Sequence, residues 1–227
     1  MYDLYIANKN YSSWSLRPWV LMRVLEIGFA EHLVPFGDAS GWAAYRELSP
    51  AGKVPCLGDG DVVVWDSLAI VEYLAEQHAG VWPADREARA WSRSAAAEMH
   101  SGFNELRSRC SMSCGIRVRL HEVPAGLERD VARLRALWSE GLHRFGGPFL
   151  GGAAFSAADA FFAPVAFRAR TYGLALGEPA ASYVKRLLDL PAMREWDRDA
   201  LAETMREPAH DAEIASVGTV LEDLRSR

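Results

Sequence analysis

Residues 49–77, SPAGKVPCLGDGDVVVWDSLAIVEYLAEQ, join two short apolar runs to a helical pattern. The runs at 54–57 and 62–65 flank Gly58-Asp59-Gly60, whose composition is typical of a β-hairpin turn. From Asp66 onward, apolar residues recur at helical spacing and glutamates fall between them. The stretch therefore predicts a strand, a turn, a second strand and a helix.

Two positions in this stretch suggest chemistry as well as structure. Pro55 heads an apolar strand, where the missing N–H weakens the ladder unless it serves another purpose. Ser67 stands at the expected helix start, where free backbone N–H groups and the helix dipole hold carboxylates. Each position also has a structural interpretation, since Pro55 fits a strand entry and Asp66-Ser67 fits an ordinary helix cap. The residues alone leave both interpretations open.

The preceding residues extend this unit into an α/β domain. Because a short helical crossover joins parallel strands, the first two strands are expected to run parallel. The element order is β-α-β-α-β-β-α, which is that of a thioredoxin-like domain over residues 1–78. The expected elements before residue 49 are a strand at 2–7, a polar loop at 8–13, a helix at 15–26 ended by Gly28, a strand at 31–36 and a helix at 41–48.

The composition changes after residue 78. Residues 79–84 are expected to be a linker, and 85–227 an all-α helical C-terminal domain with no further strand. In that domain Ser156 and Asp159 form a capping-box pattern that opens a helix to Tyr172, with Pro164 inside it. Further helices are expected at 85–109, 127–145, 179–188 and 191–201, followed by a polar, partly extended stretch at 206–227.

The composition of the 227 residues excludes several classes of function. Half are hydrophobic and 24% are charged, as in an ordinary globular protein. The net charge of −5 argues against a general nucleic-acid partner. No apolar run reaches membrane-spanning length and no signal peptide is evident, so a cytoplasmic protein without a membrane partner is expected. The three cysteines lack metal-ligand spacing, so no metal is expected.

The loop before the first helix, NKNYSSWSLRPW at 8–19, offers hydroxyls and no cysteine. Disulfide chemistry on a protein thiol is therefore disfavoured there. Tyr11, Ser12, Ser13 and Ser15 all lie near a helix N-terminus. A hydroxyl hydrogen bond together with the helix dipole favours the thiolate of a bound thiol over its neutral form. More of that thiol would be nucleophilic at neutral pH.

Several spaced motifs together resemble one protein family. SPAGKVP, the Gly-Asp-Gly hairpin and DSLAIVEYL closely resemble the glutathione-binding half of the cytosolic glutathione S-transferases, which place a helical domain after a thioredoxin-like one. The 8–19 loop resembles the Ser-Ser-x-Ser-x-Arg element of a serine-loop, bacterial or zeta-like member. Ser12 and Ser13 fall on the family's serines and Arg17 on its arginine. The resemblance implies a catalytic role for Ser12 or Ser13, with Ser12 preferred and Tyr11 as the competing hydroxyl.

The resemblance also implies a set of glutathione-binding residues. Val54, before a cis-proline at Pro55, would pair its backbone with the cysteinyl group of the tripeptide. Lys53 would approach the glycyl carboxylate. Asp66 would hold the α-amino group of the γ-glutamyl end, and Ser67 would hold its carboxylate.

The second-substrate pocket is less fully specified. Trp14 stands where the zeta class carries a cysteine, and its indole is expected to reshape that pocket. His100 is a candidate for the same pocket, although a lone helical histidine is more often a packing residue. Glu98 would reach the γ-glutamyl amine in a neighbouring subunit. A basic face is expected from Arg107, Arg109, Arg117 and Arg119. The default interpretation is a solvated surface, and the sharper alternative is a surface that attracts anionic substrates.

The implied function is that of a homodimeric glutathione S-transferase acting in detoxification. Its co-substrate would be glutathione and its second substrate an electrophilic small molecule. One alternative is a glutathione-dependent cis–trans isomerase of the maleylacetoacetate type. Another is a non-catalytic glutathione- or ligand-binding module.

Overall fold

The computed structural model describes residues 1–37 and 39–226. The side chains at 39–42 and 44 fall outside that description. The order β-α-β-α-β-β-α expected for the N-terminal part is confirmed. Its elements are β1 (Tyr2–Ile6), α1 (Ser13–Val24), β2 (Phe29–Leu33), α2 (Ala39–Leu48), β3 (Cys56–Asp59), β4 (Val62–Trp65) and α3 (Ser67–Ala75).

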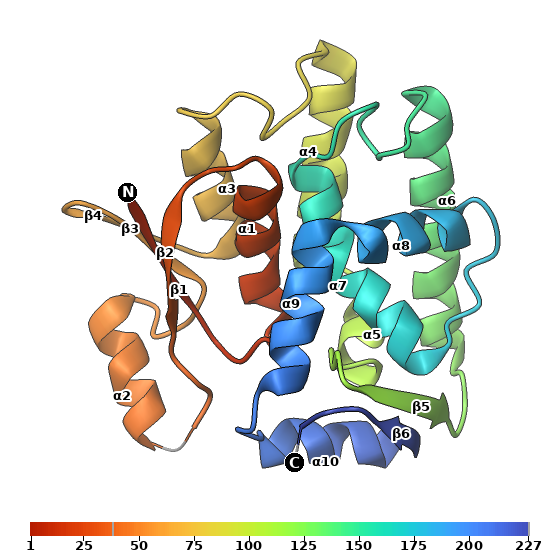
Figure 1. Ribbon diagram of the computed structural model, residues 1–227. Coiled ribbons are helices and arrows are strands. Elements are labelled where there is room, and N and C mark those ends of the chain that lie inside the picture. The colour runs from red at the N-terminus through yellow and green to blue at the C-terminus, as the bar shows by residue number, and fades with distance from the viewer. Residues whose placement is uncertain (38, 227) are drawn as a thin grey trace.

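The N-terminal part is built on a mixed four-stranded sheet in the order β2-β1-β3-β4. As predicted, β1 and β2 run parallel, whereas β3 is antiparallel to both β1 and β4. In Figure 1, α1 and α3 lie between this sheet and the helical part, while α2 lies on the other side. Leu4 and Ile6 of β1 and Leu57 of β3 are fully buried together with Leu16 and Trp19 of α1. Alternation along the strands therefore directs one face of the sheet into the core.

Several predicted boundaries in this part are wrong by a few residues. The second strand lies at 29–33 instead of 31–36. Gly28 does not cap the first helix, because α1 ends at Val24 with Leu25 as its C-cap, and the left-handed residue is Glu26 at φ 56°. The hairpin turn follows Asp59, which pairs with Val62, so the turn lies one to two residues later than predicted.

The C-terminal part is helical, and α7 is its centre (Figure 1). Nearly every residue of α7 is buried, and the helix packs against α1 of the N-terminal part as well as α4 and α8. Among the described residues, no helix has both the length and the apolar character needed to cross a bilayer. The helices are α4 (Arg86–Ser101), α5 (Asn104–Arg109), α6 (Ala125–Arg144), α7 (Ala157–Tyr172), α8 (Ala180–Asp189), α9 (Pro191–Ala202) and α10 (Pro208–Val217).

The single helix predicted at 85–109 is wrong, because the chain breaks between α4 and α5. Gly102 has extended backbone, and Phe103 adopts a left-handed conformation at φ 55°. A Cβ at position 102 would lie 2.8 Å from the Glu98 carbonyl oxygen, so the break needs glycine there. The predicted linker at 79–84 lies in the connection between α3 and α4, and the division into domains there stays a prediction.

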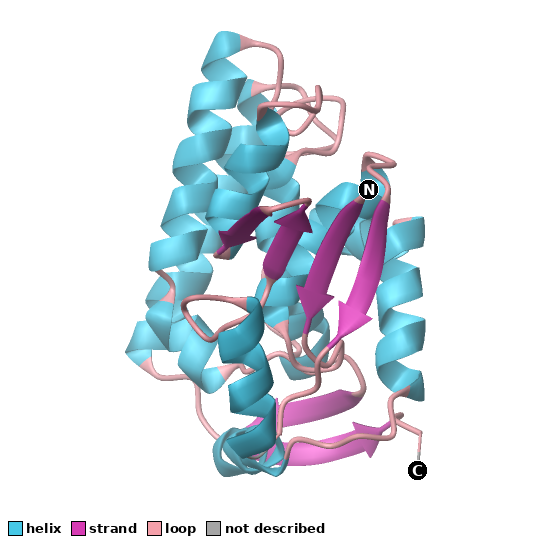
Figure 2. Ribbon diagram, turned by 90° about the vertical axis from the view of Figure 1, so that its left-hand side faces the viewer, coloured by secondary structure: helices cyan, strands magenta, loops and turns pink. Residues whose placement is uncertain are grey.

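The helical part also contains a two-stranded antiparallel sheet, although no further strand was predicted. β5 (Ile116–Leu120) pairs with β6 (Gly218–Asp223), and Figure 2 shows this sheet apart from the four-stranded one. Ile116 and Val118 are buried, which matches the alternation in IRVRL. The stretch at 206–227, expected to be polar and partly extended, forms α10 before β6.

Candidate active site

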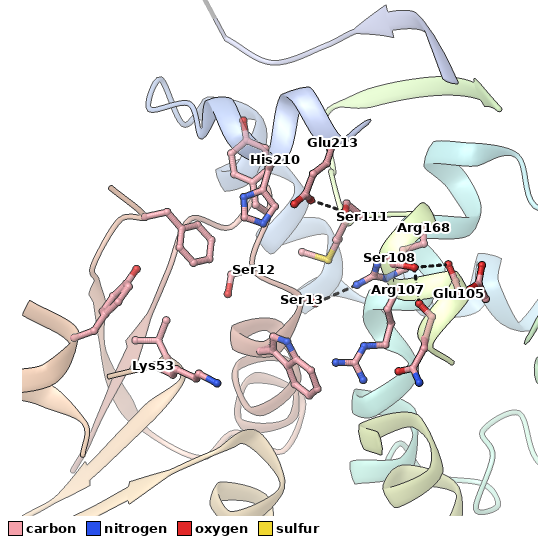
Figure 3. Close-up of a pocket in the computed structure, with 17 residues that line it drawn as sticks. Ser12, Ser13, Lys53, Glu105, Arg107, Ser108, Ser111, Arg168, His210 and Glu213 are labelled. Carbon is pink, nitrogen blue, oxygen red and sulfur yellow. Dashed lines mark hydrogen bonds between the residues drawn. The ribbon is translucent and has the colours of Figure 1, made fainter. Parts of the chain in front are cut away.

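A cavity of about 780 Å³ lies between the loop before α1 and the helical part. Figure 3 shows Ser12 and Ser13 on one side of it, and Arg168 of α7 with Arg107 of α5 on another. A third wall comes from α10, which contributes His210 and Glu213. Both parts of the molecule therefore form this cavity.

A smaller cavity of about 530 Å³ adjoins the first. It gathers every residue to which the resemblance assigned a glutathione contact, from the start of β3 and the start of α3. Trp14 and Arg107 line both cavities, so the indole of Trp14 lies at their boundary. The predicted residues brought together here are Lys53, Val54, Pro55, Asp66 and Ser67.

The start of α3 presents an unsatisfied polar group. Ser67 is 1% exposed, and its Oγ has no hydrogen-bond partner among the described residues. Asp66 caps the helix by accepting a hydrogen bond of 2.8 Å from the Leu68 N–H, and its other oxygen lies 3.5 Å from His100 Nε2. A buried hydroxyl without a partner is costly in free energy. A helix N-terminus with such a hydroxyl has the donors that a ligand carboxylate needs.

The predicted cis-proline also lines the smaller cavity. The Val54–Pro55 bond is cis, and β3 begins only at Cys56 because proline has no N–H to give to the ladder. The Val54 backbone belongs to no strand and makes no hydrogen bond to another described residue. It is free to pair with an extended peptide. Lys53 is exposed and forms no ion pair with the rest of the described chain.

The two candidate catalytic serines have different partners. Ser12 is the N-cap of α1, where its Oγ accepts from the Ser15 N–H at 3.4 Å and donates to Ser15 Oγ at 2.7 Å. Ser13 accepts a hydrogen bond of 3.2 Å from the Arg168 guanidinium. Both hydroxyls line the larger cavity, next to the N-terminus of α1.

The competing hydroxyl, Tyr11, is engaged by the C-terminal residues. It donates to Asp211 at 3.1 Å and accepts from Arg225 at 3.0 Å. The Tyr11 side chain is buried, and burial is the main cause that raises its pKa above the ordinary value. This arrangement argues against Tyr11 as the group that activates a thiol.

Positive charge gathers around Trp14. The guanidinium groups of Arg17 and Arg107 stack on its ring, 4.0 Å and 4.4 Å from the ring centroid. Arg17 is almost fully buried, and burial, with repulsion from Arg107 and Arg168, lowers its pKa well below the ordinary value. These cations contribute a positive potential beside the serines.

The predicted basic face does not form as one surface. Arg107 reaches the cavities, whereas Arg109 pairs with Glu105 at 3.1 Å. Arg117 donates to the Cys114 and Ile116 carbonyls and lies with Arg119 on β5. The default interpretation of a solvated surface fits the members other than Arg107.

The remaining candidates of α4 have partners within the chain. The ring of His100 packs edge-on against Trp14 with centroids 5.2 Å apart, in the smaller cavity. Burial is the main cause that lowers the pKa of His100. Glu98 makes two hydrogen bonds to Arg133, at 2.6 Å and 2.7 Å, so its carboxylate is already paired in a single chain.

Arg168, His210 and Glu213 are among the cavity residues that were missed from the sequence. Arg168 had a usable signal, because it is a charged residue in a largely apolar helix and buried arginines need partners. His210 and Glu213 had none, since the helix that carries them was not predicted. Within 1–37 and 39–226, no cluster of three potential ligands suits a metal ion.

Comparisons with known proteins agree with this geometry. Residues 11–77 match the family model for the glutathione S-transferase N-terminal domain. "Glutathione S-transferase 1" of Dianthus caryophyllus is 30% identical over 115 residues, which cover 47% of this chain and 48% of that protein. "Probable maleylacetoacetate isomerase" of Caenorhabditis elegans is 29% identical over 107 residues, 46% of this chain and 49% of that protein. The chain thus spans about half the length of these curated relatives.

The fold has close counterparts among solved structures. A glutathione transferase homologue from Burkholderia GL BGR1, solved with bound glutathione, superposes with a TM-score of 0.66 at 22% identity. The superposition covers 88% of this chain and 97% of that one. At this identity the likeness establishes the fold. Residues 11–77 thus match the glutathione S-transferase N-terminal domain, and the chain shares the fold of solved glutathione transferases.

Proposed function

We propose that this protein is a glutathione transferase, with glutathione bound in the smaller cavity and an electrophilic small molecule in the larger one. The observation that carries the proposal is the buried, unpartnered hydroxyl of Ser67 beside Asp66, at the N-terminus of α3. The γ-glutamyl carboxylate would accept a hydrogen bond from that hydroxyl, and Asp66 would hold the α-amino group. Val54 would pair with the cysteinyl backbone, and Lys53 would meet the glycyl carboxylate.

The proposed reaction begins with ionisation of the bound thiol. Ser12 or Ser13, together with the N-terminal dipole of α1, stabilises the thiolate, and the thiol proton passes to solvent. The sulfur then attacks an electrophilic carbon in the larger cavity. A carbon–sulfur bond forms, and the leaving group departs with its electron pair. Glutathione is the co-substrate, and this mechanism uses no metal.

A glutathione titration across pH tests the proposal. Ultraviolet absorbance of the bound thiolate is followed in the wild type, Ser12→Ala and Ser13→Ala. The expected result is a thiol pKa lower on the protein than in free glutathione, with the shift lost in at least one variant. Binding without any shift would favour the non-catalytic ligand-binding module. Absence of binding would overturn the proposal.

The isomerase remains the second candidate function. Arg107 and Arg168 on the larger cavity suit a substrate with carboxylates, and the related Caenorhabditis elegans protein is named as a probable maleylacetoacetate isomerase. In that reaction glutathione adds to the substrate and leaves again. Activity on a maleyl-type acid with no net consumption of glutathione would identify the isomerase, whereas stoichiometric consumption identifies the transferase.

The proposal includes a homodimer in the cytoplasm. The edge strand β4 presents Val62, Val63 and Trp65, each 43–47% exposed, so this edge of the sheet is apolar and suited to a second copy. Reduced thiols are maintained in the cytosol, where a glutathione-dependent enzyme finds its co-substrate. Light scattering after gel filtration is expected to give twice the chain mass, and Trp65→Lys is expected to reduce it towards the monomer. A wild-type monomer would contradict the dimer.

A further inference from the structure

The contact between Ser13 and Arg168 joins the two parts of the molecule at the reacting end of the site. Ser13 is the first residue of α1, and Arg168 lies 155 residues later on the buried helix α7. Arg168 is 6% exposed, and its Nη2 donates to Ser13 Oγ at 3.2 Å (Figure 3). Its Nη1 donates to the Cys110 carbonyl, which fixes the guanidinium in place.

The two serines differ in whether the hydroxyl proton is already used in a hydrogen bond. Ser12 Oγ is used twice within α1, as a donor to Ser15 Oγ and as an acceptor from the Ser15 N–H. Ser13 Oγ accepts from Arg168, and its own proton has no acceptor elsewhere in the described chain. A hydroxyl has one proton to donate and two lone pairs. Ser13 therefore has its proton available for a ligand in the cavity, whereas Ser12 has its proton available only when Ser15 becomes the donor in their shared hydrogen bond.

The charge behind Ser13 strengthens that donor. Burial is the main cause that lowers the pKa of Arg168 to about 10, so the guanidinium is still charged at neutral pH. A cation that donates to a hydroxyl oxygen polarises its O–H bond, because hydrogen bonds in a chain reinforce one another. The Arg168 Nε is buried and has no hydrogen-bond partner among the described residues. No carboxylate of the described chain therefore pairs with it to neutralise the guanidinium charge.

We infer that Ser13, polarised by Arg168, donates the hydrogen bond that stabilises the glutathione thiolate, and that Ser12 serves as the cap of α1. This inference rests on the proposed function. Arg168 acts through Ser13 and is a positioning residue. The helical part would then supply a component of thiol activation, in addition to the pocket for the second substrate.

The experiment measures the pKa of the bound thiol by ultraviolet absorbance in the wild type and six variants, with thermal unfolding of each. Ser13→Ala and Arg168→Met are expected to raise the thiol pKa by about one unit or more, and the double variant by no more than Ser13→Ala alone. Arg168→Lys, which keeps a cation there, is expected to recover part of the shift. Ser12→Gly keeps most of the capping ability of that position and is expected to leave the thiol pKa within a few tenths.

Arg170→Met is the matched control, because Arg170 lies on the same helix and pairs with Asp197 at 2.6 Å outside the cavity. It is expected to lower stability without moving the thiol pKa. Should Arg168→Met fail to fold, Arg168→Lys with Ser13→Ala still decides the question. Loss of the shift in Ser12→Gly but not in Ser13→Ala would overturn the inference, as would additive effects of Ser13→Ala and Arg168→Met. A wild type that binds no glutathione or shows no shift would instead overturn the proposed function.

Discussion

At the scale of single residues, Ser67 offers a clean separation of binding from stability. Its buried hydroxyl has no partner in the free protein, so Ser67→Ala removes an unsatisfied polar group. The free energy of unfolding is expected to stay level or to rise by up to about 1 kcal/mol. The dissociation constant for glutathione is expected to rise about 10-fold or more, because a charge-assisted hydrogen bond to the ligand is lost. Calorimetric titration and urea unfolding measure the two effects.

Ser92 provides the control for that prediction. It is also fully buried in α4 with an unpartnered Oγ, and it lines neither cavity of the site. Ser92→Ala is expected to leave glutathione affinity unchanged. Equal losses of affinity in Ser67→Ala and Ser92→Ala would mean that Ser67 acts only through packing.

Tyr11→Phe tests whether the tyrosine hydroxyl is structural. The change removes the hydrogen bonds to Asp211 and Arg225 and leaves this half-buried carboxylate and the guanidinium paired with it with one partner fewer each. We expect the free energy of unfolding to fall by about 1–2 kcal/mol, with no change in the pKa of bound glutathione. Denaturant unfolding and the ultraviolet titration check both parts. A raised thiol pKa in this variant would return Tyr11 to the list of activating groups.

Motif residues that lie close together in sequence were predictable, and pairs that meet only in the fold were not. Val54, Pro55, Asp66 and Ser67 fall within one short stretch whose spacing carries the resemblance, and the structure gathers them in one cavity. The Ser13–Arg168 contact depends on how α7 packs against α1. No local pattern encodes that packing, because it is set by the whole core.

At the scale of elements, the capping box of α7 predicts a pH dependence. Asp159 accepts hydrogen bonds from the Leu150 and Ser156 N–H groups and from the Tyr183 hydroxyl, at 2.8–2.9 Å. Burial nevertheless raises the pKa of Asp159 to about 6. A carboxyl with a raised pKa binds its proton more tightly in the folded state. Its contribution to stability is therefore fully present below pH 4 and is lost as the pH rises to about 6.

The matched variant for that pH dependence is Asp159→Asn, which cannot titrate. Between pH 4 and pH 7 the free energy of unfolding of the wild type is expected to fall by about 2 kcal/mol relative to that of the variant. The variant also has a penalty from its changed hydrogen bonds, which does not depend on pH. Urea unfolding followed by circular dichroism at several pH values gives the difference. A difference that stays constant across this range would contradict the raised pKa.

Elements with strong local periodicity were predicted from the sequence, and elements that depend on distant partners were not. The opening hairpin and α6 and α7 carry their pattern within their own residues. The strand β5 has only five residues, and its partner β6 comes about 100 residues later, so its pairing was not visible in the sequence. The break at Gly102 was signalled by a glycine inside a helical pattern and was passed over.

At the scale of the whole molecule, Lys9 joins the two parts. Its Nζ lies 2.8 Å from Glu31 of β2 and 2.9 Å from Asp199 of α9, with the rings of Trp19 and Trp196 around it. Lys9→Met removes this cation from both carboxylates and leaves them with the more exposed Arg23 and Arg198, and we expect the free energy of unfolding to fall by about 2 kcal/mol. Tryptophan fluorescence during urea unfolding measures the loss. Lys53→Met, at an exposed lysine without an ion pair among the described residues, is expected to change it by less than about 0.5 kcal/mol.

The bonds from Tyr11 to Asp211 and Arg225 also set an order for biosynthesis. A ribosome makes the loop at 8–19 before the groups that brace it, which emerge about 200 residues later. At about 5–20 residues per second, the loop waits on the order of 10–40 s for them. Throughout that interval the nascent N-terminal part exposes the α1 surface that α7 later covers. Chaperones are therefore expected to bind this surface during that period.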